Sequence, residues 1–591
     1  MGFTQDISIE KHSEQIEINE DGSFLRKVSI KFKKSDEPII FPIFYDYELE
    51  KLSDIKLVYR KGKKIKTIEN ITMDERVVDL DYYTSKRVKS ILIPPGVSTV
   101  INYTVTCSEL MYFSHLPFFS HNFVDTLEYK VQVPNSHDFI YNIINKDSLK
   151  SMVMDSIDLE KSKGWNFSTR PQKVESDMLS LFGIFKDQKN PLMRILLVPE
   201  HYNKDGLKFM NDWYLDKVDA KRGLNRKAIE KIDELTENVS ESSEILKILY
   251  DYVHQNFKYV AIEIGMGAFI PTHANEVFLR KEGDCKDLSN FLSEALNYKG
   301  IKSEIALAAT YHHISDCDFP SLSSANHVVC VAYLGDKTII LDPTDPVHYP
   351  ESPVESLQNR SILVVNDSGG QWFKINSFEN EQNLIDYNIG LKADTKNISL
   401  TGLLKVSYNG ITGNFLKRNF LQSENEDVYE FTKDHLKNII GNQSVTNLII
   451  KENDQDVKIE SEISVSGRIF NDGKQKILIL DFLPSLIETS MTDAILEGSH
   501  LGSNFKKSVR LTIGMNETFE PFKPRLVHLN DEHSSLSIEI KALSDTQITC
   551  TYDFQIQDQS ITKANIESIN ASIALFKQTI NEPLVLETTS K

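Results

Sequence analysis

The N-terminal part of the chain carries the alternating hydrophobic pattern of β-strands. In QIEINEDGSFLRKVSIKF, an Asp21-Gly22 dipeptide is flanked by apolar residues of regular parity, namely Ile16 and Ile18 before it and Phe24, Val28, Ile30 and Phe32 after it. Alternation on both sides of an Asp-Gly dipeptide predicts a β-hairpin. The segments ILIPPGVSTVINYTVTC and LEYKVQVPNSHDFIYNI continue the pattern. We therefore predict an antiparallel β-sandwich over residues 1–205, with one face of each strand exposed to water.

The spacing of apolar residues changes to a helical one after about residue 205. SESSEILKILYDYVHQNF has apolar residues at positions 245, 246, 248, 249, 252 and 253, behind serines that could cap a helix. The polar segment NRKAIEKIDELTENV before it also reads as a helix, and KEGDCKDLSNFLSEALNYKG predicts a third with a buried apolar stripe. The runs SEIALAAT, NHVVCVAYL and KTIILDPT then predict strands. Helices followed by strands indicate a compact α+β domain over residues 206–370.

The β pattern returns in the C-terminal part. DVKIESEISVSG alternates at Val457, Ile459, Ile463 and Val465, and a helix is expected near residues 425–440. We predict a β-rich domain with a helix over residues 371–505 and a C-terminal β-rich segment over residues 506–591. Within that last segment, TKANIESINASIALFKQTI predicts a helix. The expected fold class is therefore multidomain, with β domains on both sides of an α+β core.

Length and charge limit what the chain can be. A chain of 591 residues is too long for one hydrophobic core. Its 40% hydrophobic and 26% charged residues are ordinary for globular domains. The net charge of −19 would repel phosphate backbones, so we do not expect nucleic acid as a partner.

Targeting and metal signals are weak. No segment approaches the roughly 20 apolar residues of a membrane span, and MGFTQDISIEKHSEQ lacks the features of a signal peptide. The five cysteines are scattered and form no CxxC pair, so neither a zinc ribbon nor a disulfide framework is predicted. The pair His312-His313 could bind a metal, but no further ligands at suitable spacing support it. We expect no metal and no cofactor.

One cysteine stands apart from an apolar run. Cys285, in EGDCKD, lies at the start of the predicted third helix, after Gly283, which permits a sharp turn, and Asp284, which can cap the helix. Asp287, three residues later, can complete a capping box. The positive end of a helix favours a thiolate, and its free N–H groups can stabilise an oxyanion. The two acids oppose the thiolate unless capping occupies their charges.

A nucleophilic cysteine needs a base and a group that orients the base. His327 opens the predicted strand NHVVCVAYL, and Asp342 ends the next predicted strand. A hairpin between these strands would bring His327 and Asp342 within reach of each other. Asp345 is a rival orienting group, although it lies beyond the strand end. Taken singly, His327 could be a surface residue and Asp342 a turn residue.

The other cysteines are weaker candidates. Cys317 lies in SDCDF between acids that oppose its ionisation, and Cys330 falls on the opposite face of its strand from His327. Cys107 and Cys550 lie in strand-like runs, which is typical of core residues.

Three segments together resemble a known family. NFKYVAIEIGMGAFIPTHANEVFLRK, EGDCKDLSNFLSEALNYKGIKSEIAL and NHVVCVAYLGDKTIILDPTD are similar, over residues 225–365, to the transglutaminase-like (papain-like) core of bacterial proteins. The resemblance implies a catalytic triad of Cys285, His327 and Asp342 and nominates Tyr259 as an oxyanion donor. This chain departs from the family at Asn326, where an aromatic residue or Asp often precedes the histidine.

The resemblance also implies a function. A Cys-His-Asp triad performs acyl transfer on amide bonds, and we expect a peptide or protein substrate and hydrolysis as the main outcome. Two alternatives stay open: a transglutaminase that uses an amine acceptor, and a binding or scaffold protein with a relic core. Members of the family are usually exported, so a periplasmic, cell-envelope or secreted location is expected, with the cytoplasm as the alternative. The oligomeric state is left open.

Overall fold

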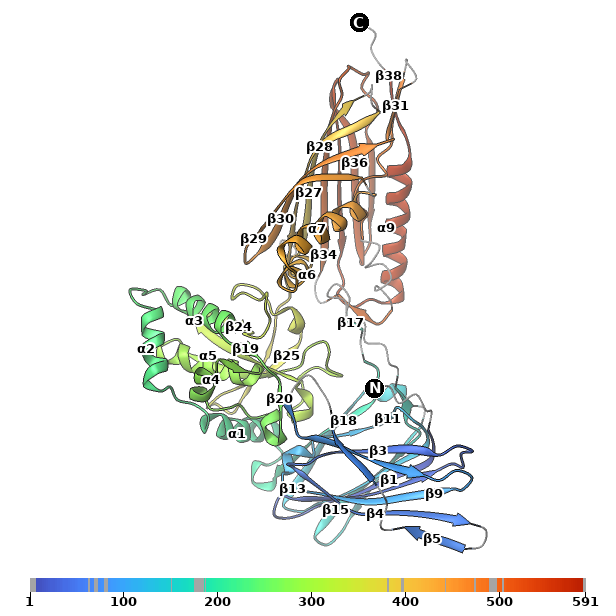
Figure 1. The fold of residues 1–591 in the computed structure, drawn as a ribbon, viewed down its shortest axis with the longest axis vertical. Helices are drawn as coiled ribbons and strands as arrows, with labels where there is room; N and C mark the ends of the chain where they lie inside the picture. Colours follow the sequence, from blue (N-terminus) through green and yellow to red (C-terminus); the bar gives the residue numbers. More distant parts are fainter. Residues whose placement is uncertain are drawn as a thin grey trace. The chain divides into compact units, whose positions relative to one another are not determined.

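The computed structural model describes residues 7–587 apart from 62–63, 69–72, 79–82, 150, 175–184, 187, 380–381, 395–397, 442, 472–474, 488–496 and 502–503. The chain forms two compact units. Unit 1 comprises residues 1–176, 188–344 and 360–375, and unit 2 comprises residues 177–187, 345–359 and 376–591. Figure 1 shows strands predominating in the N-terminal and C-terminal parts of the chain, with helices gathered in the green part that comes between them in sequence.

The N-terminal part of unit 1 is built on an eight-stranded sheet. Its strands, in spatial order, are β14 (Met152–Asp158), β15 (Ser162–Thr169), β12 (Phe123–Pro134), β1 (Ser8–Ile18), β2 (Phe24–Phe32), β9 (Thr99–Cys107), β4 (Glu50–Lys61) and β5 (Lys64–Ile68). The predicted hairpin around Asp21-Gly22 is present as β1 and β2. The sheet is not purely antiparallel as predicted, because β12 returns by a long connection and pairs in parallel with β1.

Smaller sheets complete this part. Two are three-stranded: β3 (Ile39–Asp46), β8 (Lys86–Ile93) and β6 (Met73–Val77) form one, and β10 (His115–Pro117), β18 (Leu192–Pro199) and β13 (His137–Ile144) form the other. β11 (Phe119–Ser120) pairs with β16 (Gln172–Lys173). The large sheet shares one hydrophobic cluster with β10, β13 and β18 and a second with β3 and β8. The interior of the sandwich is therefore divided between two clusters.

The α+β part of unit 1 places five helices with a five-stranded sheet. The helices are α1 (Gly206–Asp219), α2 (Arg226–Leu235), α3 (Ser242–Asn256), α4 (Ala274–Arg280) and α5 (Cys285–Tyr298). The sheet order is β24 (Lys337–Leu341), β23 (His327–Leu334), β22 (Ser303–Ala308), β25 (Ser361–Val365) and β26 (Gln371–Lys374). The apolar stripe of α5 is buried against β23, with Phe291 and Leu292 in the same cluster as Cys330. The serines expected to cap α3 do not do so, because the helix begins at Ser242 with Glu241 at the N-cap position.

Short strands and a shared cluster join the two parts of unit 1. β7 (Tyr83–Thr84) pairs in parallel with β20 (Ile262–Glu263), and β19 (Lys258–Tyr259) pairs with β21 (Glu282–Gly283). The Ser321 hydroxyl donates to the carbonyl of Ile195 at 2.7 Å. A hydrophobic cluster includes Leu196 from β18 and Leu307 from β22. These contacts make the N-terminal sheets part of the surroundings of the α+β core.

Unit 2 is built on a second eight-stranded sheet. Its order is β29 (Ser444–Glu452), β30 (Asp456–Ser466), β28 (Ser399–Asn409), β27 (Leu384–Asp394), β34 (Phe505–Gly514), β37 (Gln547–Ile556), β36 (Ser534–Ser544) and β35 (Arg525–Asn530). A small sheet contains β31 (Ile469–Asn471), β32 (Gln475–Leu478) and β38 (Leu584–Glu587), and β17 (Phe185–Lys186) pairs with β33 (Ser499–His500). The predicted boundary at 505/506 falls inside the large sheet, because β27 and β34 pair in parallel across it.

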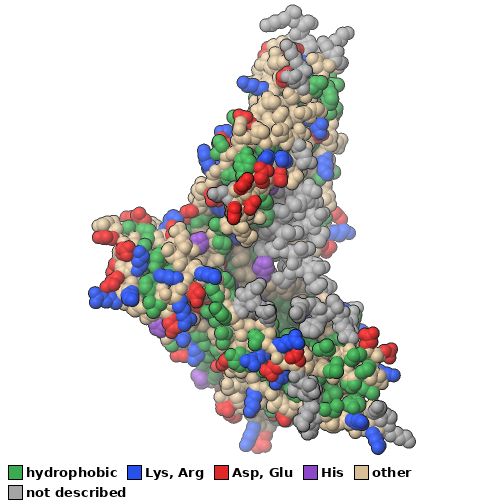
Figure 2. Space-filling view, viewed as in Figure 1, with side chains coloured by type: hydrophobic (Ala, Val, Ile, Leu, Met, Phe, Trp, Pro, Cys, Tyr) green, Lys and Arg blue, Asp and Glu red, His purple; other side chains and the backbone are tan. Residues whose placement is uncertain are grey.

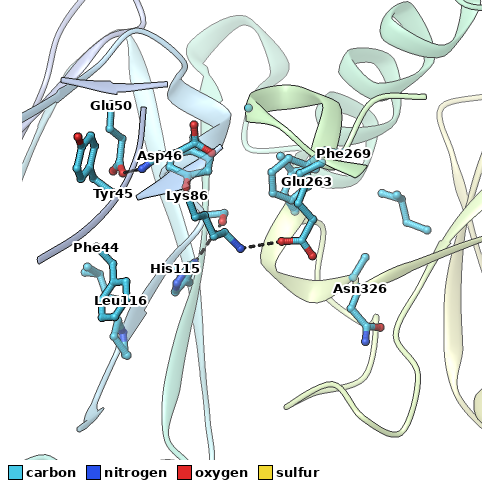
Figure 3. Close-up of a pocket in the computed structure, with 18 of the residues that line it drawn as sticks. Phe44, Tyr45, Asp46, Glu50, Lys86, His115, Leu116, Glu263, Phe269 and Asn326 are labelled. Atoms are coloured by element: carbon cyan, nitrogen blue, oxygen red, sulfur yellow. Dashed lines mark hydrogen bonds and ion pairs between the residues drawn. The ribbon is translucent and has the colours of Figure 1, made fainter. Parts of the chain in front are cut away.

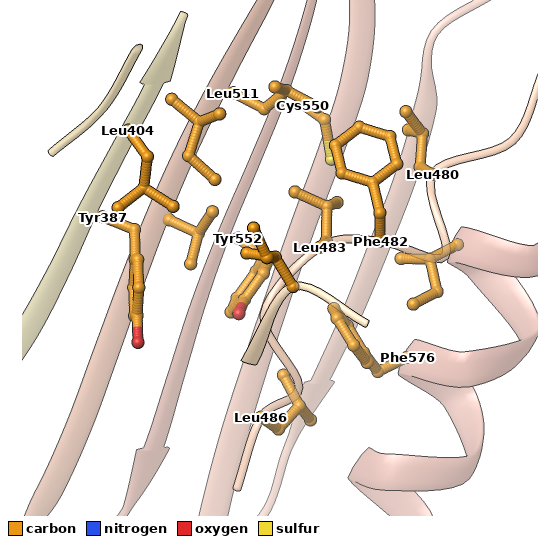
Figure 4. Packing of buried hydrophobic residues seen from close by; sticks show 14 of the residues in the cluster. Tyr387, Leu404, Leu480, Phe482, Leu483, Leu486, Leu511, Cys550, Tyr552 and Phe576 are labelled. Carbon is orange, nitrogen blue, oxygen red and sulfur yellow. The ribbon is translucent and has the colours of Figure 1, made fainter. Parts of the chain in front are cut away.

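Helices cover this second sheet. α6 (Gly410–Leu421) and α7 (Asn425–Ile439) follow β28, and α9 (Lys563–Asn581) is the helix expected near the C-terminus. Figure 4 shows Phe576 of α9 with Tyr552, Phe482 and Leu483, beside the sheet residues Tyr387 and Leu511. In the part of the chain that the structure describes, no helix combines the length and apolarity of a membrane span. On the face shown in Figure 2, acidic and basic side chains are interspersed.

Candidate functional site

Cys285 is the first residue of α5, as the sequence predicted, and it lies between the two residues of a capping box, Asp284 and Asp287. The Asp287 N–H donates to Oδ1 of Asp284 at 3.3 Å, and the Asp284 N–H donates to Oδ2 of Asp287 at 3.3 Å. The first N–H groups of a helix have no acceptor within the helix, and the positive end of its dipole lies there. The Cys285 sulfur is therefore attached where a helix favours negative charge.

Further contacts occupy the two acids that flank the thiol. Asp284 forms a buried ion pair with Lys286, and Asp287 accepts a hydrogen bond from the Thr272 N–H at 2.6 Å. Burial raises the pKa of Asp284, and the Lys286 cation opposes that rise. Sequence reasoning missed Lys286, because its position beside Asp284 gives no sign that a lysine would be only 3% exposed. The acids thus act in helix capping and ion pairing.

Glycine is required at position 283 because the side chain of Asp287 lies close to its backbone. A Cβ atom at this position would lie 2.6 Å from Cβ of Asp287, which is too close for any side chain. The sequence had suggested a sharp turn that needs glycine's freedom, but Gly283 is not among the residues with positive φ. Its carbonyl accepts a hydrogen bond from the Val260 N–H at 3.0 Å, which fixes the backbone just before the thiol.

His327 and Asp342 meet through the hairpin of β23 and β24. The turn contains Gly335, at φ +59°, and the strands pair as far as Cys330 and Leu341. Nε2 of His327 lies 2.7 Å from Oδ2 of Asp342, and the two side chains are 12% and 4% exposed. The predicted contact between these residues is present.

Neighbours hold Asp342 in place. Its Oδ1 accepts hydrogen bonds from the N–H of Thr344 at 3.0 Å and from the Thr344 hydroxyl at 2.7 Å. Its carbonyl oxygen accepts from the hydroxyl of Tyr250, on α3, at 2.9 Å. One carboxylate oxygen is thereby committed to Thr344 and the other to His327.

The environment of His327 favours its protonated form. Burial alone would lower the pKa of His327, but the charge and hydrogen bond of Asp342, together with the interaction with Cys285, raise that pKa well above its ordinary value. Because Asp342 occupies Nε2, Nδ1 is the ring nitrogen left for the thiol. Cys285 and His327 line the same cavity. The structure therefore brings together the three residues that the sequence grouped.

Asn326, which precedes His327, has a local role. Its side-chain oxygen accepts from the Thr310 N–H at 2.9 Å, and its amide donates to the Thr310 hydroxyl at 3.0 Å. These bonds tie the end of β22 to the residue that precedes His327.

The other four cysteines are buried, whereas Cys285 is half-buried. Burial raises the pKa of Cys107 to about 11, and it raises the pKa of both Cys317 and Cys550 to about 12. Burial raises the pKa of Cys330 as well. Cys317 was expected to be a poor nucleophile because of its acidic neighbours, but burial is the larger cause, and its thiol donates to the Leu307 carbonyl.

The remaining candidates lie elsewhere. Asp345, the rival orienting group, forms an ion pair with Arg418 at 3.0 Å within unit 2. His313 contacts Ser315 through Nδ1. The described residues contain no group of three or more His, Cys, Asp or Glu side chains placed to hold a metal ion.

Tyr259 lies on β19, which pairs with the strand that leads into Cys285. Its side chain is half exposed. Burial, followed by the negative charges of Cys285, Asp284 and Asp342, raises the pKa of Tyr259. The hydroxyl is therefore protonated at neutral pH and could donate a hydrogen bond, and its role as oxyanion donor stays a prediction.

A cavity of about 600 Å³ contains Cys285 and His327 in its lining. Its opposite wall comes from the N-terminal sheets, including Phe44, Asp46 and Leu116. Figure 3 shows Lys86, on β8, reaching across to Glu263, on β20, with 2.8 Å between Nζ and Oε2. The N-terminal β part thus helps to form the space in front of the thiol, which the sequence did not reveal.

Known proteins resemble this chain in fold, and none that matches it over its length establishes its chemistry. No protein-family model matches the chain, and no curated protein matches it. A crystal structure of a candidate protease from Parabacteroides distasonis matches with a TM-score of 0.59 at 13% identity, covering 98% of this chain and 99% of that one. The two proteins therefore share a fold over nearly their whole lengths.

Other solved structures match only in part. An M1 zinc metallopeptidase from Deinococcus radiodurans has a TM-score of 0.18 at 10% identity, covering 36% of this chain and 54% of that one. A mutant M1 zinc metallopeptidase bound to L-tryptophan has a TM-score of 0.19 at 12% identity, with the same coverage of 36% and 54%. These similarities are too low to support an argument about this chain.

Proposed function

We propose that the chain is a cysteine-dependent peptidase that hydrolyses amide bonds of peptides or proteins. The observation that carries this proposal is the placement of a half-buried thiol at a helix start, in one cavity with a histidine whose Nε2 lies 2.7 Å from a buried carboxylate. The full-length likeness to a protein described as a candidate protease supports the same reaction class. Nucleophile, base and orienting group are the parts that covalent acyl transfer needs.

The first step forms a thioester. The Cys285 thiolate attacks the carbonyl carbon of the substrate amide, and negative charge develops on the carbonyl oxygen. The first N–H groups of α5 can donate to that oxygen, and we assign Tyr259 as a second donor. The protonated His327 then gives its Nδ1 proton to the amide nitrogen, the C–N bond breaks and the amine leaves.

The second step releases the acyl group. Neutral His327 accepts a proton from water while the water oxygen attacks the thioester carbonyl. The C–S bond breaks, which yields the carboxylic acid product and restores the thiolate beside the protonated imidazole. Asp342 holds the ring and favours its charged form in both steps. An amine in place of this water would give transglutaminase chemistry at the same site.

The experiment is a cleavage screen on a broad mixture of folded and unfolded proteins that also contains a fluorescent primary amine. We expect wild type to create new N-termini that the Cys285→Ala variant does not create. Amine incorporation without new N-termini would show a transglutaminase instead. If wild type and variant give the same products on the whole panel, the peptidase proposal is wrong and a scaffold role is favoured.

A further inference from the structure

Two charged residues interrupt the apolar interior of the N-terminal sandwich. Arg26 shares the inward parity of Phe24 and Val28 on β2, and Glu14 shares that of Ile16 on β1. In the register of the hairpin, Glu14 pairs with Val28 and Ile16 pairs with Arg26. The apolar residues on either side belong to separate clusters, Ile16 and Phe24 to one and Val28 to the other. The division of the sandwich interior coincides with these charges.

Glu14 and Arg26 lie at the cavity of the candidate active site. Glu14 and Arg26 line that cavity together with Asp46 from the end of β3, Glu50 from the start of β4, and Cys285. Charged groups in the interior of a sandwich are costly unless they are paired or bind a ligand. These charged groups line the same cavity as the thiol.

The charges in the cavity do not balance. Among the groups that line the cavity, Glu14, Asp46 and Glu50 face a single guanidinium, that of Arg26, while His12 contacts Glu14 from outside the lining. The two lysines that line the cavity are already paired, Lys86 with Glu263 and Lys286 with Asp284.

His115 does not supply the missing positive charge. Burial, assisted by the Arg26 cation, lowers the pKa of His115 to about 4, so the ring is neutral at pH 7. An excess of negative charge therefore remains on this wall.

Two of the three carboxylates have capacity for a ligand. Asp46 is satisfied by Ser85 and by the N–H groups of Glu48 and Leu49. Glu14 is 9% exposed, and its Oε1 lies 2.9 Å from Nε2 of His12. Among the described residues none donates a hydrogen bond to its Oε2, which lies 3.4 Å from Nε of Arg26. Glu50 accepts one hydrogen bond, from the Asp46 N–H at 2.9 Å.

The pKa shifts of Glu14 and Glu50 are consistent with a capacity to bind a cation. Burial would raise the pKa of Glu14, but Arg26 and His12 lower it, so this carboxylate is ionised at neutral pH. Burial raises the pKa of Glu50, the hydrogen bond from the Asp46 N–H and the Arg26 cation oppose that rise, and the charges of Asp46 and Glu14 add to it. A cation bound between them would relieve the repulsion that Glu50 experiences.

We propose that Glu14 and Glu50 form a subsite that binds an alkylammonium group of the substrate, either a lysine-type side chain or a free α-amino group. An ammonium is compact and has three donors, which suits two carboxylates with unused oxygens. The rings of Tyr112 and Tyr129 also line the cavity and can cover an alkyl stem. A substrate carboxylate on Arg26 is disfavoured, because it would add an anion beside Glu14 and Glu50. The inference rests on the proposed peptidase function.

The test uses internally quenched peptides that carry lysine, Nε-acetyl-lysine, glutamate or alanine at each position around the cleaved bond. Each peptide is made with a free and with an acetylated N-terminus. We expect kcat/KM to be about 10- to 100-fold higher for lysine than for acetyl-lysine at one position, or for the free over the acetylated N-terminus. The arm that shows the preference identifies the source of the ammonium.

Substitutions at Glu14 and Glu50 test whether these residues cause the preference for an ammonium group. Glu14→Gln should reduce the lysine to acetyl-lysine ratio, or the corresponding N-terminal ratio, towards one. The matched control is Glu17→Gln, on the outward face of β1 in an exposed ion pair with Lys27, and it should leave the ratio unchanged. Should Glu14→Gln fail to fold, Glu50→Gln and the wild-type ratio still decide the matter.

Several outcomes would overturn the inference. Turnover that depends on Cys285 but shows no ammonium preference in either arm would disprove the subsite and leave the peptidase proposal intact. A preference for glutamate would assign the wall to Arg26 instead. Without any turnover, the peptidase proposal fails, and calorimetric titration of the lysine and acetyl-lysine peptides into the Cys285→Ala protein tests the subsite alone: equal affinities would refute it.

Discussion

Replacing His327 with glutamine is expected to lower kcat/KM for a cleaved peptide by about 10³- to 10⁴-fold. In the proposed mechanism, the imidazole keeps a positive charge beside Cys285 and donates a proton to the leaving amine. Glutamine keeps a polar side chain of moderate size but cannot carry the proton. The loss should therefore appear in kcat rather than in KM.

The same variant should slow alkylation of Cys285 by iodoacetamide at pH 6 to 7, as followed by mass spectrometry of the cysteine peptides. The four buried cysteines serve as internal references, because they should react slowly in both proteins. His528→Gln, at an exposed position on β35, is the matched control. A His327→Gln protein that is folded and retains wild-type activity would exclude His327 as the acid and base.

Replacing Asp342 with asparagine is expected to lower kcat/KM by about 10²-fold or more at pH 8. If Oδ1 keeps its two hydrogen bonds from Thr344, the new amide nitrogen faces Nε2 of His327. An amide donor at Nε2 favours the tautomer that carries its proton on Nδ1, which cannot accept a proton from the thiol. The substitution removes charge while keeping shape.

The pKa of His327 predicts in which direction Asp342→Asn shifts the pH profile of kcat/KM. In wild type the pKa of His327 is raised well above its ordinary value, so the proton donor persists and the basic limb of kcat/KM lies well above pH 6.5. Asp342→Asn removes the largest influence that raises this pKa, while burial still lowers it. The basic limb should therefore move to lower pH, and activity should fall more at pH 8 than at pH 6.

The free energy of unfolding should also depend on pH, because the pKa of His327 differs between the folded and the unfolded state. Because the folded-state pKa of His327 is raised, the pair with Asp342 stabilises the fold fully below the unfolded-state pKa of about 6.5. That contribution disappears as pH rises through the folded-state pKa. Denaturation of wild type and Asp342→Asn should differ more at pH 6 than at high pH. Asp336→Asn, at the exposed turn of the same hairpin, is the control, and an unchanged profile in Asp342→Asn would contradict the account.

Local patterns predicted much of the fold. The Asp21-Gly22 hairpin, the helix that starts at Cys285 and the helix after residue 562 all follow from short-range spacing and capping residues. Pairings between distant segments could not be predicted in this way. The parallel pairs of β1 with β12 and of β27 with β34 join strands far apart in sequence, so the alternation of each strand says nothing about its partner.

The residues of the candidate site also differ in whether the sequence alone could predict them. Cys285, His327 and Asp342 lie at the ends of local elements, and their proximity follows from one helix start and one hairpin. Glu14 and Arg26 were missed, although a signal existed: Glu14 shares the parity of Ile16 and Ile18 on β1, and Arg26 shares that of Phe24 and Val28 on β2. Alternation identified that face, but only the packed sheets show that it lines a cavity with the thiol.

The proposed mechanism requires that the Cys285 sulfur carries the acyl group during turnover. The most direct measurement is rapid acid quenching of the wild-type protein with an activated peptide ester, followed by mass spectrometry of the intact chain and of its cysteine peptides. We expect a mass increase equal to the acyl group on the peptide that contains Cys285, and no such increase in Cys285→Ala. Turnover with no adduct, or with the adduct on another residue, would contradict it.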